Sequence, residues 1–179
     1  AEIAALCTAI KTARPKCIVM VDNCYGEFTE EMEPTAVGAD LAVGSLIKNP
    51  GGGIAPTGGY IAGREDLVEL AASRLTAPGI GAEVGSFVDG YRLFYQGLFL
   101  APHTTAQAMK SALFAAAFFE AQGYPVHPSA SCVRHDIIQG IELGRAEKLV
   151  AFCRGLQKYS PVDSHLKPGP APMPGYPDP

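Results

Sequence analysis

A run of five apolar residues, Cys17 to Val21, constrains the fold of this chain more than any other segment. It is rich in β-branched residues, and no polar residue alternates with the apolar ones. A strand with one solvent-exposed face alternates between polar and apolar residues, whereas a continuous apolar run is typical of a strand buried on both faces. Parallel sheets covered by helices bury their strands in this way. The run therefore predicts an α/β fold built on a parallel sheet.

Strand and helix patterns alternate along the first half of the chain. Further strands are expected at 39–43 and 59–63, and helices at 3–13, 65–74, 106–121 and 146–157. Apolar residues cover most of the surface of the helix at 106–121, so we expect it to be buried between layers or at a subunit contact. This order of elements supports the α/β class.

Composition excludes several classes of protein. Fourteen basic and eighteen acidic residues give a net charge of −4, without the basic excess that a nucleic acid partner requires. No apolar run approaches the roughly 20 residues that span a bilayer, so we expect no membrane partner. The five cysteines are odd in number and form no CxxC pair, which indicates reduced thiols and a cytoplasmic protein.

The two ends of the chain have the character of cut edges. The first residue is alanine rather than an initiator methionine. Seven of the 15 prolines lie between Pro161 and Pro179, and proline disfavours helix interiors and central strands. We therefore expect an extended segment there, and we interpret the sequence as a central piece of a larger protein.

Two polar residues stand where predicted strands end. Asp22 directly follows the run that ends at Val21, and Lys48 lies just past the strand at 39–43. If these strands are parallel neighbours, the carboxylate and the amine open on the same edge of the sheet, where α/β proteins bind their ligands. Ser45, three residues before the lysine, offers a hydroxyl to a phosphate.

This combination suits pyridoxal phosphate. A lysine amine can form a Schiff base with this cofactor, and a carboxylate at the ring nitrogen keeps the ring protonated, so that it accepts electrons from a carbanion. Each residue alone has a simpler explanation, because an aspartate after a strand is often a turn residue and a loop lysine is usually solvated. A cofactor-free Schiff-base aldolase would use Lys48 but would leave Asp22 and Ser45 without a shared role.

Longer segments of the chain resemble a known family. They are Val21-Asp-Asn-Cys-Tyr-Gly-Glu-Phe28, Ser45-Leu-Ile-Lys-Asn-Pro-Gly-Gly-Gly53, Gly58-Gly-Tyr-Ile-Ala-Gly63 and Gln96-Gly-Leu-Phe-Leu-Ala-Pro-His103. These segments are similar to the cofactor block of the fold-type-I pyridoxal phosphate enzymes of Cys/Met metabolism. The nearest resemblance is to the methionine γ-lyase-like, or aluminium-resistance, branch of these enzymes, and it extends over nearly the whole chain.

The resemblance implies roles for individual residues. Lys48 would be the catalytic lysine that forms the Schiff base, Asp22 would bind the pyridinium nitrogen, and Ser45 would bind the cofactor phosphate. Tyr25 would donate a hydrogen bond to the phenolic oxygen of the cofactor, and a half-buried packing tyrosine is the equal alternative. The wider family often has a hydroxyl residue just before the lysine, and this chain has Ile47 there.

The resemblance also implies a domain organisation around a mostly parallel sheet flanked by helices. Residues 1–125 would form the later half of the large cofactor-binding domain with its connecting helix, 126–160 the start of a smaller C-terminal domain, and 161–179 a proline-rich extended segment. The family's upstream glycine-rich phosphate loop and its downstream arginine for the substrate carboxylate are not found in this sequence. We therefore expect the 179 residues alone to bind cofactor weakly and to turn over poorly.

The implied function is that of a pyridoxal phosphate-dependent carbon–sulfur lyase. Such an enzyme releases a 2-oxo acid and ammonia from a sulfur-containing amino acid, and the resemblance implies a homo-oligomer, a dimer or tetramer. An aminotransferase is the alternative reaction type. A non-catalytic remnant or assembly module of the same fold is the alternative from another class.

Other residues carry weaker signals. Cys24 is better explained as a small packing residue than as a redox thiol. The four histidines have no metal-ligand spacing, so we expect no metal site, and no nucleotide-binding glycine motif is present. Solvated or packing roles are the default for Arg74, Arg92 and Tyr95.

Overall fold

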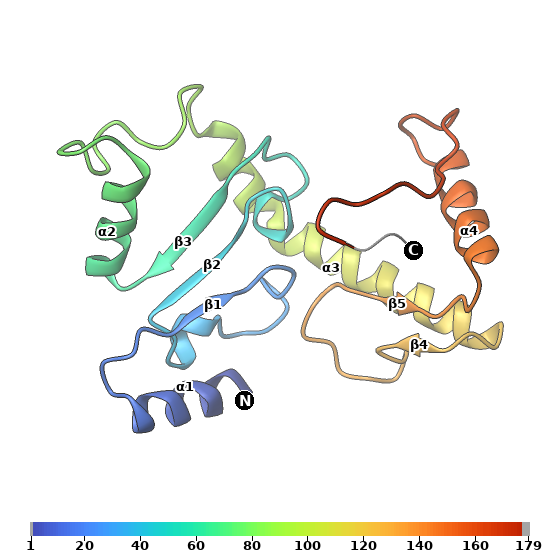
Figure 1. The fold of residues 1–179 in the computed structure, drawn as a ribbon, viewed down its shortest axis with the longest axis horizontal. Coiled ribbons are helices and arrows are strands. Elements are labelled where there is room, and N and C mark those ends of the chain that lie inside the picture. Colours follow the sequence, from blue (N-terminus) through green and yellow to red (C-terminus); the bar gives the residue numbers. More distant parts are fainter. Residues whose placement is uncertain (1, 177–179) are drawn as a thin grey trace.

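The structure, a computed structural model, describes residues 2–176 and contains two small sheets joined by a long helix (Figure 1). In chain order its elements are α1 (Glu2–Ala13), β1 (Met20–Asp22), η1 (Pro34–Val37), β2 (Leu41–Ser45), η2 (Asn49–Gly51), β3 (Gly59–Gly63), α2 (Glu65–Leu75), α3 (Arg92–Ala121), β4 (Val126–His127), β5 (Gly140–Ile141) and α4 (Ala146–Lys158). The architecture is mixed α/β, as predicted.

The helices follow the predicted pattern with one large difference. Helices α1, α2 and α4 begin and end within one residue of the predicted bounds. The helix predicted at 106–121 begins instead at Arg92 and continues through Pro102. Proline normally breaks or kinks a helix, so no helix is expected before Pro102. Buried residues nevertheless recur at helical spacing in both halves of α3, at Gly97, Ala101, Thr105, Ala112 and Ala116.

The three-stranded sheet has the order β1-β2-β3. Strands β1 and β2 are parallel, with Asp22 beside Val43, whereas β2 and β3 are antiparallel, with Ser45 beside Gly59. Of the two pairings in this sheet, β1 with β2 agrees with the predicted parallel sheet, and β2 with β3 does not. A parallel return normally needs a crossover helix, and the link from β2 to β3 contains only the short η2 turn.

Burial is one-sided in the described residues, which differs from the burial on both faces predicted for the first strand. The core beside the sheet is formed by Cys7, Val19 and Ala39 under α1, but Met20 in β1 is 60% exposed. Helix α3 likewise buries Ala101, Ala112 and Ala116 while Phe114 is 72% exposed. The first predicted strand is thus covered on one side only, and the 106–121 helix is buried along one face within residues 2–176. That its other face lies at a subunit contact stays a prediction.

A buried carboxylate connects α1 to the sheet. Asp40 accepts hydrogen bonds from the ammonium of Lys11, from the backbone N–H of Val19 at 2.8 Å and from Arg64 Nη1 at 3.2 Å. The Lys11 ammonium, then the Val19 N–H and Arg64, hold the pKa of Asp40 well below its ordinary value of 3.8. These contacts satisfy a charge that would be unfavourable if it were unpaired.

We expect Asp40 to set part of the acid sensitivity of the fold. Its pKa is lowered on folding, so its stabilisation is complete above about pH 3.8 and is lost as the pH falls through the lower folded-state value. Asp40→Asn should lower the denaturant midpoint at pH 7, and the gap to wild type should narrow below pH 4. Asp89→Asn, at an exposed position, is the control, and a gap of constant size would contradict the assignment.

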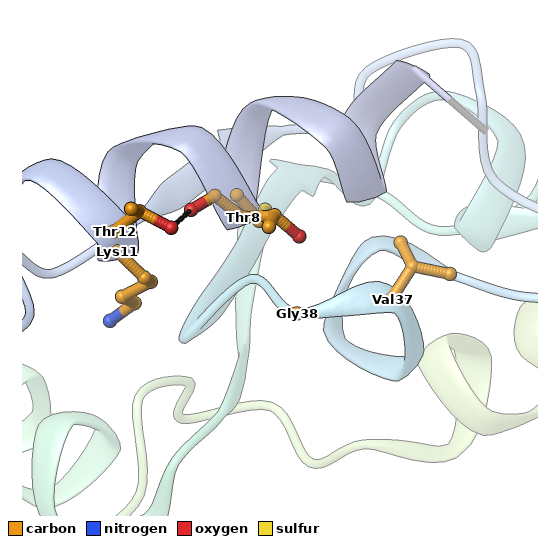
Figure 2. A pocket seen from close by; sticks show the side chains of 6 residues that line it. Thr8, Lys11, Thr12, Val37 and Gly38 are labelled. Carbon is orange, nitrogen blue, oxygen red and sulfur yellow. Dashed lines mark hydrogen bonds between the residues drawn. The ribbon is translucent and has the colours of Figure 1, made fainter.

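Two further features concern helix α1 and the last part of the described chain. A shallow hollow is lined by Cys7, Thr8, Lys11, Thr12, Val37 and Gly38, between α1 and the end of η1 (Figure 2). Residues 161–176 form no helix or strand and contain turns near both ends, and the last three residues of the predicted extended segment lie outside the described part. Among the helices of residues 2–176, none has the length and apolar character needed to cross a bilayer.

Candidate active site

The first sheet brings the predicted polar residues to one edge. Asp22 is the last residue of β1 and Ser45 the last residue of the parallel neighbour β2. The N–H of Asn23 donates to the carbonyl of Val43 at 2.8 Å, which keeps the two strands paired up to this edge. Lys48 follows three residues later, and its N–H donates to the carbonyl of Ser45 at 3.3 Å. The carboxylate, the hydroxyl and the amine therefore lie at the same end of two parallel strands.

The side chain of Lys48 lies over an aromatic ring. Its Nζ is 5.3 Å from the centre of the Tyr25 ring, a distance at which an ammonium is attracted to the ring face. Tyr25 lies in the turn that follows β1 and has a φ of 74°. A non-glycine residue in this left-handed region costs about 1–3 kcal/mol, so the neighbouring contacts must favour this position strongly.

Asp22 is kept ionised by its neighbours. It accepts a hydrogen bond from the backbone N–H of Cys24 at 3.1 Å. This bond, then the Cys24 thiol and the positive charge of Lys48, lower the pKa of Asp22 below its ordinary value. Since Asp22 is also exposed, the edge offers a charged acceptor that a ligand can reach.

Cys24 is half-buried beside Asp22, in keeping with the packing role predicted for it, and it also contacts the candidate site. Its thiol lies against the carboxylate of Asp22 and near the backbone of Ser45. Burial, followed by the hydrogen bond to Asp22, raises the pKa of the thiol. A thiol with a raised pKa stays protonated and is a poor nucleophile, so its S–H remains able to donate a weak hydrogen bond to Asp22.

Three further residues support the site and were not found by sequence patterns. Asn49, Glu27 and Tyr60 are joined by hydrogen bonds behind the turn that carries Tyr25. One signal for them was present, because a glycine inside a strand, here Gly44, often marks a close approach of other groups. The signal does not say which side chains fill the space.

The segment after Lys48 is fixed by close packing on α3. A Cβ atom added to Gly97 of α3 would lie 2.8 Å from the carbonyl carbon of Gly51, which is closer than such atoms approach. Thr104 also donates a hydrogen bond to the carbonyl of Gly52 at 3.3 Å. Because Gly97 and Gly51 have no side chains, η2 packs directly on α3. This contact fixes the position of the segment that directly follows Lys48.

The other predicted candidates do not join this group. Arg74 lies in the last turn of α2, and Arg92 and Tyr95 lie in the first turn of α3. His127 pairs with Glu142 at 2.9 Å, and His135 pairs with Glu30. Within residues 2–176, no group of three or more His, Cys, Asp or Glu side chains is arranged to bind a metal ion.

The whole chain, residues 1–179, matches the family model described as methionine gamma-lyase. A Bacillus subtilis (strain 168) protein, "Uncharacterized protein YnbB", is 49% identical over 99% of this chain and 42% of its own length. An "Uncharacterized 33.9 kDa protein in glnA 5'region" of Lactobacillus delbrueckii subsp. bulgaricus is 51% identical over 99% of this chain and 58% of its own length. The chain thus spans about half the length of these curated relatives.

Solved structures resemble the chain equally closely. The structure named "putative cystathionine beta-lyase involved in aluminum resistance" from Listeria monocytogenes has a TM-score of 0.94 and 51% identity, covering 98% of this chain and 43% of that one. The structure named carbon-sulfur lyase involved in aluminum resistance from Clostridium novyi NT has a TM-score of 0.92 and 49% identity, covering 96% of this chain and 41% of that one.

Proposed function

This chain belongs to the methionine gamma-lyase family, and on that premise we propose that it carries the cofactor-binding edge of a pyridoxal phosphate-dependent carbon–sulfur lyase. The substrate would be a sulfur-containing amino acid. One observation carries the proposal above all. An ionised aspartate and a lysine lie at the same end of two parallel strands, close enough for the lysine to lower the pKa of Asp22.

The chemistry of these side chains fits the cofactor. Pyridoxal phosphate, when bound, supplies an aromatic ring that accepts electrons from the substrate carbanion. Asp22, with its lowered pKa, would accept a hydrogen bond from the protonated ring nitrogen. Lys48 would hold the carbonyl end of the cofactor, and Ser45 would donate to the phosphate. Tyr25, whose ring lies beneath Lys48 Nζ, would orient that amine.

The amine of Lys48 would also move a proton. As a neutral base, Nζ takes the proton from the α-carbon of the amino acid. The carbon–sulfur bond then breaks, its electron pair leaves with sulfur, and the sulfur takes up a proton to depart as a thiol. Water replaces the nitrogen, so the products are a thiol, a 2-oxo acid and ammonia. The name of the Clostridium novyi relative, a carbon-sulfur lyase, supports this class of reaction.

Covalent fixation of the cofactor tests the proposal. The full-length protein is incubated with pyridoxal phosphate, treated with borohydride and digested, and the modified lysine is identified by mass spectrometry. We expect near-stoichiometric label on the peptide that contains Lys48 and background label on Lys110, an exposed lysine of α3. Equal labelling of both lysines would show that the cofactor reacts without a site, and would favour a non-catalytic module.

A further inference from the structure

We infer that Glu27 is a positioning residue of the candidate site: its carboxyl, buried against Gly44 and bonded to the Tyr60 hydroxyl, holds the turn that keeps Tyr25 beneath Lys48. The inference rests on the proposed function, because it concerns the placement of a residue of that site. Its decisive test, however, needs no cofactor.

The turn after β1 needs an external support. Two of its non-glycine residues, Tyr25 at a φ of 74° and Phe28 at a φ of 62°, adopt left-handed backbone conformations. Such conformations persist only where surrounding contacts impose them. Glu27 lies between these two residues, so whatever fixes Glu27 fixes the strained part of the turn.

Hydrogen bonds from two other elements reach the turn at this point. The side-chain amide of Asn49 in η2 donates to the carbonyls of Tyr25 and Glu27, both at 3.0 Å. The hydroxyl of Tyr60 in β3 donates to Glu27 Oε1 at 2.9 Å. Glu27 is only 3% exposed. The turn is therefore attached to the sheet through a buried side chain as well as through its backbone.

The sheet makes room for this carboxyl at one position. Gly44 in β2 stands beside Tyr60 of β3. A Cβ atom on Gly44 would lie 2.6 Å from Tyr60 Cε1 and closer still to Glu27 Oε1. Since glycine weakens a strand interior, its presence here is explained by the space that the Glu27 and Tyr60 side chains occupy.

The carboxyl is best accommodated as the neutral acid. Its second oxygen, Oε2, is buried and has no hydrogen-bond partner within residues 2–176. Burial is the main cause that raises the pKa of Glu27 above 4.5, the charge of Glu33 adds to it, and the Tyr60 hydroxyl opposes it. The titratable groups that face Glu27 are Tyr60 on β3 and Glu33 and Cys24 on its own loop.

The sign of the pH effect follows from this raised pKa. The support is complete below the ordinary value of 4.5, and it weakens as the pH rises through the folded-state pKa of Glu27. The opening equilibrium of the turn should increase by up to roughly ten-fold per pH unit across that interval, because opening releases one proton. Glutamine has the same shape, accepts from Tyr60 and does not ionise, so Glu27→Gln should remove this dependence.

Hydrogen exchange of the full-length protein without cofactor tests the inference. Protection factors of amides 23–33, corrected for intrinsic exchange, are compared over a pH series for wild type, Glu27→Gln and the control Glu31→Gln, an exposed residue of the same loop. We expect protection to fall with pH in wild type and in the control, and to stay level in Glu27→Gln. The same fall in Glu27→Gln as in wild type would overturn the inference.

Two more variants separate the positioning role from general destabilisation. Glu27→Ala should lose protection of residues 23–33 at every pH, whereas Glu27→Gln should retain it. Tyr60→Phe, which loses the hydrogen bond to Glu27, should show lower protection than wild type already at the lowest pH of the series. In the same proteins, the affinity of Glu27→Gln for pyridoxal phosphate relative to wild type should increase with pH. A wild type that takes no cofactor would refute the proposed function alone, and unchanged protection in Glu27→Ala would refute the positioning role alone.

Discussion

Lys48→Ala is expected to abolish carbon–sulfur lyase activity in the full-length protein, with turnover lower by at least about 10²–10⁴-fold, the usual contribution of a general base. The reason is that Nζ of Lys48 would both hold the cofactor and accept the α-proton. Activity is measured as release of 2-oxo acid and thiol from sulfur-containing amino acids. Lys110→Ala, at an exposed position of α3, should retain wild-type turnover.

A second substitution separates the charge of Lys48 from its basicity. Lys48→Arg keeps a cation over Tyr25 and beside Asp22, but a guanidinium cannot give up its proton in a protein. This variant should therefore retain wild-type stability and lose activity as fully as the alanine variant. Retention of a tenth or more of wild-type turnover would exclude Lys48 as the base.

Gly97→Ala is expected to lower the free energy of unfolding by about 3 kcal/mol. The added methyl group would be forced into the backbone of Gly51, which cannot move aside as a flexible side chain can. Because η2 directly follows Lys48, its displacement should also lower cofactor binding. Denaturant unfolding and titration with pyridoxal phosphate measure the two effects.

Gly155→Ala is the matched control for this substitution. Gly155 lies in α4, and within residues 2–176 a Cβ atom placed there meets no atom within 4 Å apart from its own helix backbone. Since alanine is a better helix former than glycine by about 1 kcal/mol, this variant should be slightly more stable than wild type. Equal effects of the two substitutions would show that α3 and η2 do not touch closely.

Much of the fold follows from patterns that are local in sequence. Helical spacing and punctuating residues predict α1, α2 and α4, and glycines on both sides predict β3. Asp22 and Lys48 could be singled out because each follows a predicted strand, and a parallel pairing is enough to bring such residues to one edge. These features depend on the backbone periodicity of each element, which the order of apolar and polar residues reveals.

The rest depends on contacts between distant segments, which periodicity does not contain. The antiparallel β3 follows from the shape of the η2 link, and the exposure of Met20 follows from which side of the sheet α1 covers. Glu27 reads as an ordinary surface acid until Gly44 and Tyr60 are seen around it. The supports of a site are therefore harder to predict than its reactive groups.

The contact between the turn after β1 and the segment beyond α3 has a consequence for the order in which the chain folds. The hydroxyl of Thr29 donates to the carbonyl of His135 at 2.9 Å, across 106 residues of sequence. At about 5–20 residues per second of translation, the turn waits roughly 5–20 seconds on the ribosome before this acceptor is made. The sheet edge that carries Lys48 is therefore fully synthesised several seconds before His135, the acceptor for Thr29, becomes available to the turn.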